Sequence, residues 1–159
     1  MLSTLSRRLP AFRTLRTAAL LSTLALAAAC DDDDDITGDD EPEIESVRLV
    51  ITPSGGTATT YTVTANGATP SPVQLRVGAA TIVATPHDAG GRAVDEASEF
   101  ELRMGGLPTG VTFTQSGTLT ATITATAATT TNATVSATMW HRTEGHGDYT
   151  ANFPLRVAQ

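Results

Sequence analysis

The residues best suited to chemistry lie near the end of the chain, between positions 140 and 149. This stretch holds two of the three histidines, His141 and His146, together with Glu144 and Asp148. Imidazole and carboxylate groups are ligands that Zn²⁺ and Cu²⁺ accept in proteins. His87 lies in a second predicted loop that we expect near the same end of the fold. These five residues form a candidate site for zinc or copper.

The same stretch also has a simpler interpretation, as a polar hairpin loop between two strands. Gly145 and Gly147 would supply positive φ angles there, and Asp148 would bond locally to the backbone. Two histidines separated by four residues in a loop match no established metal-binding spacing. A metal site and a plain hairpin therefore both stay open.

Catalytic chemistry finds less support in the sequence. No serine lies in a G-x-S-x-G motif, and residues 90–91 and 105–106 are glycine turns rather than a phosphate-binding loop. Glu96, Glu99 and Glu101 form a small acidic cluster, which a solvated strand face explains without acid–base chemistry. We therefore predict a protein that is not an enzyme, with no catalytic residue and no cofactor apart from the candidate Zn or Cu.

The lone cysteine, Cys30, excludes an internal disulfide framework and any zinc site built from several cysteines. Before it lie a basic segment, residues 1–17, and a run of 12 small and apolar residues, 18–29. A permanent membrane-spanning helix needs about 20 such residues. The shorter run after a basic segment instead indicates a secretory signal.

Residues 26–30, Leu-Ala-Ala-Ala-Cys, resemble the lipobox of bacterial lipoproteins. The resemblance implies that the thiol of Cys30 is acylated, that residues 1–29 are removed as a signal peptide, and that Cys30 becomes the new N-terminus. It also implies that the membrane is a partner, bound through this lipid, and that the protein is in the cell envelope, facing the periplasm or the cell surface. The alternative is an ordinary signal peptide cleaved near Ala29, with Cys30 incidental.

Negative charge is concentrated just after Cys30. Of the 17 acidic residues in the chain, 10 lie within residues 31–45. Such a run repels itself and holds few apolar residues, so we expect a disordered acidic tether over residues 30–45. A calcium-binding tail is the alternative, although the D-x-D-x-D-G spacing is missing. From residue 46 onward, 7 acidic residues face 6 arginines, which argues against nucleic-acid binding because that requires a clustered basic surface.

From residue 46 onward, apolar and polar residues alternate in short runs separated by Gly, Pro and Asn turns. Alternation with a period of two predicts half-buried strands, and turns every 8–12 residues are typical of a sandwich. We predict an all-β fold over residues 46–159: an Ig-like antiparallel β-sandwich of about 7–9 strands. The expected strands are residues 47–52, 59–65, 73–77, 80–85, 100–104, 111–114, 118–126, 134–140 and 149–157. Pro154 lacks an N–H group, so we expect the last strand to bend or to lie at a sheet edge.

The predicted core consists of the apolar residues that share one face of these strands. They are Val47, Leu49, Ile51, Val63, Leu75, Val77, Ile82, Phe100, Leu102, Leu119, Ile123, Val135 and Phe153.

Residues 73–139 resemble bacterial Ig-like domains. The resemblance rests on the strand–turn–strand pattern over residues 76–94 and on the segments 116–121 and 133–138. It implies a spacer, surface or adhesive module. The segment from His141 to Tyr149 is also similar to one in uncharacterised exported bacterial lipoproteins.

The leading hypothesis is a lipid-anchored, non-catalytic Ig-like module of the cell envelope, with an interaction, adhesion or structural role and an envelope protein as its candidate partner. Residues 111–114 and the last strand are the candidate edges for pairing with a partner strand. The alternative is a periplasmic metal-binding lipoprotein that uses the stretch from His141 to Asp148.

Overall fold

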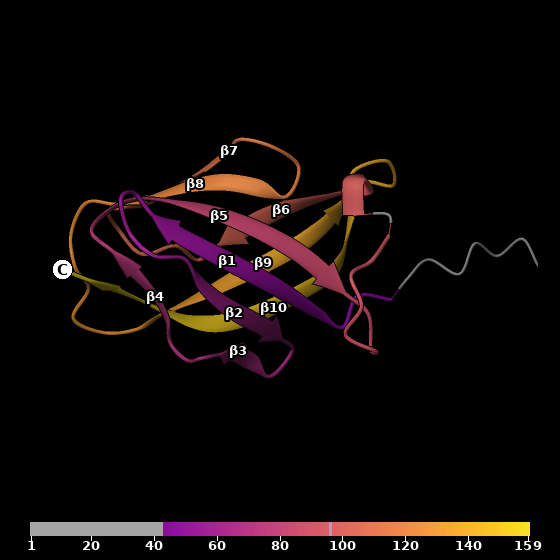
Figure 1. Cartoon of the computed structure of the whole chain (residues 1–159), viewed down its shortest axis with the longest axis horizontal. Helices are drawn as coiled ribbons and strands as arrows, with labels where there is room; N and C mark the ends of the chain where they lie inside the picture. Colours follow the sequence, from indigo (N-terminus) through magenta and orange to yellow (C-terminus); the bar gives the residue numbers. More distant parts are fainter. Residues whose placement is uncertain (1–42, 96) are drawn as a thin grey trace, which may run out of the picture. The chain divides into compact units, whose positions relative to one another are not determined.

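The computed structural model describes residues 43–95 and 97–159, which form ten strands and one short 3₁₀ turn (Figure 1). Residues 1–29, Cys30 and most of the expected tether lie outside the described residues. The elements are β1 (Ser46–Pro53), β2 (Thr59–Thr64), β3 (Gly67–Thr69), β4 (Val73–Arg76), β5 (Gly78–His87), η1 (Ala97–Glu99), β6 (Phe100–Gly105), β7 (Val111–Gln115), β8 (Thr120–Ala125), β9 (Ala133–His141) and β10 (His146–Ala158).

The strands form two sheets. The six-stranded sheet has the order β3-β2-β1-β5-β8-β7, and the four-stranded sheet has the order β4-β10-β9-β6. Neighbouring strands are antiparallel, except that β4 runs parallel to β10. The prediction of an all-β sandwich of antiparallel strands is confirmed. The strand count is ten because a short strand, β3, forms after the Asn66-Gly67 turn, where the sequence suggested a proline-rich link.

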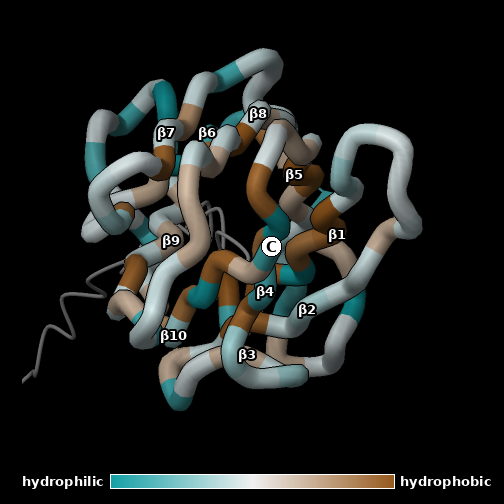
Figure 2. The backbone as a smooth tube through the Cα atoms, turned by 90° about the vertical axis from the view of Figure 1, so that its left-hand side faces the viewer, coloured by the Kyte–Doolittle hydropathy of each residue, from teal (hydrophilic) through white to brown (hydrophobic). Residues whose placement is uncertain are grey.

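The core lies between the sheets, on the inward faces of the strands. Figure 2 shows hydrophobic and hydrophilic positions interspersed along several strands. Twenty-six apolar residues are buried there, and they include eleven of the thirteen predicted core residues. Leu119 is only partly buried. Val77 is 39% exposed, because the chain leaves β4 at this point and crosses to the other sheet through Gly78, whose φ is 117°.

Two prolines lie inside strands where the sequence suggested strand ends or edges. β5 continues through Pro86, which pairs with Val47 of the neighbouring strand β1. The carbonyl of Pro86 accepts a bond from the N–H of Val94, so this residue directs its backbone groups away from β1 and its missing N–H leaves that ladder intact.

Pro154 is the second case, and the prediction of an edge strand there is wrong. β10 lies inside its sheet, between β4 and β9. The register with β4 begins only at Leu155, so Pro154 precedes that ladder and removes no bond from it.

Polar contacts also join the two sheets. The Tyr149 hydroxyl, on β10, donates to the Val63 carbonyl of β2 at 3.3 Å. The N–H of Leu102, on β6, donates to the Thr118 carbonyl at 2.9 Å. At the start of the domain Ile44 is buried and the N–H of Glu45 donates to the His87 carbonyl, so contacts begin before the expected boundary at residue 46.

Candidate functional site

The predicted metal ligands from His141 to Asp148 lie on the hairpin that joins β9 to β10. The prediction of a hairpin between two strands is confirmed, and its turn is shorter than expected, because β9 ends at His141 and β10 begins at His146, with these two residues paired. Gly145 closes the turn with a φ of 77°, and its N–H donates to the His141 carbonyl at 2.9 Å. The register shifts between Gly147 and Tyr149, which is a β-bulge.

His141 is a core residue and not a loop residue. Its exposed fraction is 4%, and it is the one buried polar side chain within residues 43–95 and 97–159. The ring packs edge-on against Phe100, with 5.2 Å between the ring centroids. The alternation of buried residues along β9 continues to His141, so the period of two already contained this signal.

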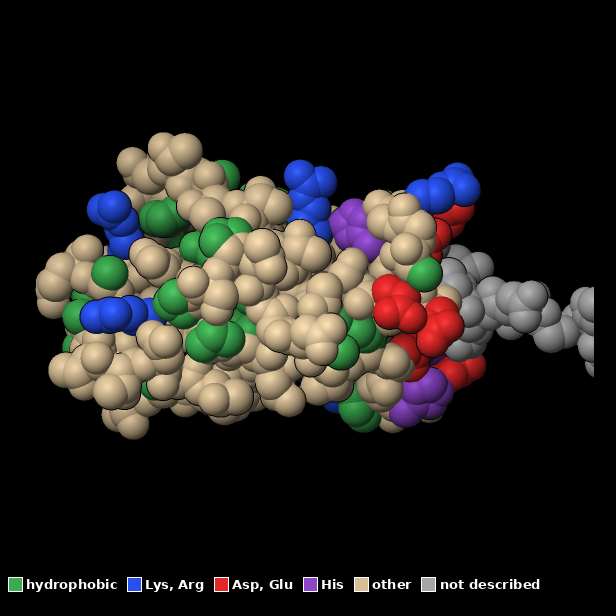
Figure 3. All heavy atoms as spheres, turned by 90° about the horizontal axis from the view of Figure 1, so that it is seen from below, with side chains coloured by type: hydrophobic (Ala, Val, Ile, Leu, Met, Phe, Trp, Pro, Cys, Tyr) green, Lys and Arg blue, Asp and Glu red, His purple; other side chains and the backbone are tan. Residues whose placement is uncertain are grey.

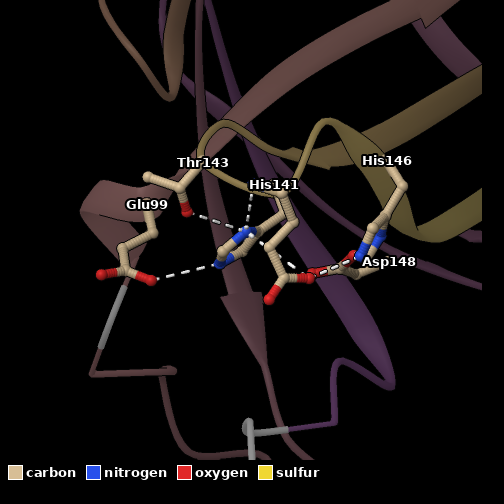
Figure 4. A network of polar contacts seen from close by, with 6 residues as sticks. Glu99, His141, Thr143, His146 and Asp148 are labelled. Atoms are coloured by element: carbon tan, nitrogen blue, oxygen red, sulfur yellow. Dashed lines mark hydrogen bonds and ion pairs between the residues drawn. The ribbon is translucent and has the colours of Figure 1, made fainter.

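Hydrogen bonds fix the tautomer of His141 (Figure 4). Nδ1 accepts the backbone N–H of Glu144 at 3.3 Å and lies 3.2 Å from the Thr143 hydroxyl. A nitrogen that accepts these bonds carries no proton, so the ring proton lies on Nε2. Nε2 donates to the carboxylate of Glu99 at 3.1 Å. The sequence placed Glu99 on a solvated face and did not single out Thr143, because neither contact has a local signal in the chain.

His146 lies in an ion-pair cluster on the surface of the hairpin. Its Nε2 is 2.5 Å from the carboxylate of Glu144, and its Nδ1 is 2.5 Å from that of Asp148. The hydrogen bond from Glu144 raises the pKa of His146 above its ordinary value of 6.5; partial desolvation opposes this, and the charges of Asp148 and Glu144 add to it. Both ring nitrogens therefore serve as donors when His146 is protonated.

The contacts of His141 and those of His146 belong to one network. The His141 and His146 rings stack with 6.2 Å between centroids and 22° between planes. A Glu144 carboxylate oxygen lies 4.0 Å from Nδ1 of His141. The hairpin thus brings together four of the five predicted metal ligands, within a network that also includes Glu99.

His87 is the predicted ligand that the network does not include. It is the last residue of β5, in the other sheet, and its Nδ1 lies 3.0 Å from the Thr85 carbonyl. Among the described residues, the side-chain hydrogen bond of His87 stays within β5 and does not reach the hairpin. Histidines and acidic side chains do gather on this end of the domain (Figure 3).

The network favours an ion-pair and hydrogen-bond role over metal coordination. No group of three or more His, Cys, Asp or Glu among the described residues is placed to hold a metal ion. Each His146 nitrogen already faces a carboxylate, and His141 directs its proton to Glu99. The zinc or copper site stays a prediction.

The free edges of the sheets are the second feature with functional meaning. Open edges invite pairing with another strand, and natural proteins block them with short strands, prolines, charges or covering loops. Three of the four edges carry such a device. β3 has three residues and is followed by Pro70 and Pro72. On β4, the N–H and carbonyl of Gln74 bond to the buried Tyr61 hydroxyl at 3.2 and 3.4 Å.

On β6, the N–H of Leu102 already donates a hydrogen bond to the Thr118 carbonyl, and the ion pair Glu101–Arg103 adds charge to this edge strand. β7 differs from the other edges. It has five residues, Val-Thr-Phe-Thr-Gln, with no charge and no proline. The Phe113 ring is only partly buried against the core. β7 is therefore the open edge of the described domain.

No protein-family model, curated protein or solved structure matches this chain. Among the described residues, no helix is long and apolar enough to cross a membrane.

Proposed function

We propose that the chain is a lipid-anchored, non-enzymatic module of the bacterial cell envelope that binds a partner protein by strand pairing along β7. The observation that carries this proposal is the contrast between β7 and the three blocked edges. A strand that is long enough to pair and carries no blocking device is suited to accept another strand through its main-chain groups.

The anchor in this proposal is Cys30. The lipobox resemblance of residues 26–30 supports acylation of its thiol, after which removal of residues 1–29 leaves the lipid at the new N-terminus. Each buried CH₂ contributes about 0.8 kcal/mol, so two or three acyl chains hold a protein on a membrane where one chain would not. The acidic residues that follow act as a tether that keeps the domain off the surface.

The resemblance of residues 73–139 to bacterial Ig-like domains supports the same function. Such domains serve as surface, spacer or adhesive modules, and the chain has the all-β sandwich that they use. The histidines of the hairpin also form hydrogen bonds and ion pairs with nearby glutamates, as expected of a structural network.

Site-specific photo-crosslinking in intact bacteria tests the binding edge. A benzoylphenylalanine is placed at Thr114 on β7 or, as the matched control, at Thr62 on the solvent face of β2; both threonines are exposed. We expect a cross-linked protein adduct from position 114 and none from position 62. Equal labelling at the two positions, or none at either, would contradict a function for the β7 edge.

The anchor has its own test. The full chain and its Cys30→Ala variant are expressed in a bacterial host with an alkyne fatty acid, and the label is measured in membrane and soluble fractions. We expect label and membrane association in the parent and loss of both in the variant. A parent that takes up no label would show that Cys30 is incidental.

A second candidate function, zinc or copper binding, draws on the hairpin contacts of Glu144, His146 and Asp148. Its measurement is the melting temperature of the full chain with and without Zn²⁺ or Cu²⁺. A stabilising shift in the parent that disappears in His146→Ala supports a metal site. The absence of a shift in the parent dismisses it.

A further inference from the structure

The register of β7 shows which of its backbone groups are available. The N–H of Thr126 donates to the Gly110 carbonyl, and the N–H of Ser116 donates to the Thr120 carbonyl, both at 2.9 Å. These two bonds flank the β7–β8 ladder and place Thr112 and Thr114 at its hydrogen-bonded positions. The main-chain groups of Phe113 and Gln115 therefore point away from β8, toward the open side.

We propose that β7 pairs antiparallel with β7 of a second copy of this chain, with Phe113 on the two-fold axis. The inference rests on the proposed function and names its partner. The two six-stranded sheets would then continue into each other, which removes the open edge from both copies.

The backbone of β7 is self-complementary in this register. Phe113 exchanges N–H and carbonyl bonds with its own counterpart. The N–H of Gln115 meets the carbonyl of Val111 in the second copy. The N–H of Val111 is already bonded to the Pro108 carbonyl at 3.0 Å, and the pairing does not require it. The Gln115 side chain turns back to the Gly117 and Thr118 carbonyls, so it leaves the edge clear.

The side chains of β7 match in the same register. Thr112 of one copy lies directly opposite Thr114 of the other on the solvent face, and paired threonines hydrogen-bond across strands. The partly buried Phe113 rings meet on the inner face, where aromatic pairs are favourable. β7 has no charge that would repel its counterpart, and anchoring of both copies to one membrane raises their effective concentration.

A charge-swap experiment tests this pairing with the full-length chain. Two copies with different affinity tags are co-expressed, and the fraction that co-purifies is measured. T112K/T114K places a lysine opposite a lysine in every pair, and T112E/T114E does the same with glutamates. Both threonines are exposed, so the melting temperature of each variant should stay close to that of the parent.

We expect parent copies to co-purify, and co-purification to fall about tenfold or more for lysine with lysine and for glutamate with glutamate. Lysine with glutamate should restore it. T60K/T62K, on the solvent face of β2, is the matched control and should pair as the parent does. Parent copies that do not co-purify, or swapped charges that fail to restore pairing, would overturn the inference. A Thr114 adduct with a different protein would then still support the proposed function.

Discussion

At the scale of single residues, the two histidines of the hairpin have opposite environments although the sequence groups them together. His141 is buried, and its ring carries its proton on Nε2, toward Glu99. His146 is exposed and lies between two carboxylates. Burial of a polar ring is tolerated when its nitrogens are hydrogen-bonded. His141 therefore contributes to the fold, whereas His146 responds to the solvent.

Truncation of these residues should separate the two roles. His141→Ala removes a packed ring together with its hydrogen bonds to Glu99 and to the Glu144 N–H, so we expect a loss of about 2–4 kcal/mol in the free energy of unfolding. His146→Ala is the matched control and should lose far less, because exposed ion pairs contribute little. Urea denaturation of the two variants measures the difference. Equal losses would mean that His141 does not hold the core end of the hairpin.

The protonation of His146 should make part of the stability depend on pH. Its pKa in the folded protein lies above the ordinary value of 6.5, chiefly because of the Glu144 hydrogen bond. A raised folded-state pKa means that the contact stabilises fully below pH 6.5 and that this contribution is lost as the pH rises through the folded-state pKa. The advantage in melting temperature over His146→Gln should therefore shrink toward alkaline pH.

Proton NMR of the His146 ring gives the same information directly. The titration midpoint should lie above 6.5 in the parent and should fall in Glu144→Gln, which keeps the size of the side chain but removes its charge. A midpoint at or below 6.5 in the parent would show that the carboxylates do not hold the imidazolium.

At the scale of elements, periodicity predicted most strands because it reports burial directly. β1, β2, β8 and β9 alternate in sequence and are buried on the predicted face. The differences arise where tertiary context decides. Pro86 and Pro154 are tolerated inside strands because their neighbours require no N–H there. The polarity of His141 predicts a loop position, whereas the alternation along β9 places its side chain in the core.

The contacts of the candidate site were less predictable than the strands. The proximity of Glu144, His146 and Asp148 follows from their closeness in sequence within one hairpin. The contact of Glu99 with His141 joins residues that are far apart in the chain. It depends on the pairing of β6 with β9, which no local pattern encodes. The sequence did predict an edge at residues 111–114, and the sheet order confirms it for β7. That the other three edges are blocked became visible only in the structure.

Two glycine turns should respond differently to an added methyl group. Gly106, directly after β6, has a φ of 69°, and a Cβ there would lie 2.7 Å from the backbone carbonyl oxygen of Thr134. Gly145 has a φ of 77° and open space around it. We expect Gly145→Ala to cost about 1 kcal/mol for the backbone conformation alone, and Gly106→Ala to cost clearly more because β9 must also move. Thermal unfolding measures the loss of stability in each variant. Equal losses would contradict the close approach at Gly106.

At the scale of the whole molecule, the sheets are bound by a shared core and by bonds that cross between them. Val63, on β2, accepts the Tyr149 hydroxyl of β10. Thr118, which leads into β8, accepts the Leu102 N–H of β6. Tyr61, also on β2, bonds to the backbone of β4. Each of these contacts joins one sheet to the other. Unfolding of one sheet would therefore break these bonds and expose the buried face of the other sheet.

Unfolding should therefore be a single cooperative transition for the whole sandwich. Trp140 is the only tryptophan, and it lies on β9 of the four-stranded sheet with the Arg103 guanidinium 3.8 Å from its ring centroid. Its fluorescence reports that sheet, whereas far-UV circular dichroism reports both. We expect the two urea transitions to coincide, as two-state behaviour requires. Tyr149→Phe, which removes one crossing bond, should shift both curves together to lower urea by about 1 kcal/mol in free energy. A fluorescence transition that precedes the circular dichroism transition would show that the four-stranded sheet unfolds by itself and that the crossing bonds do not couple the layers.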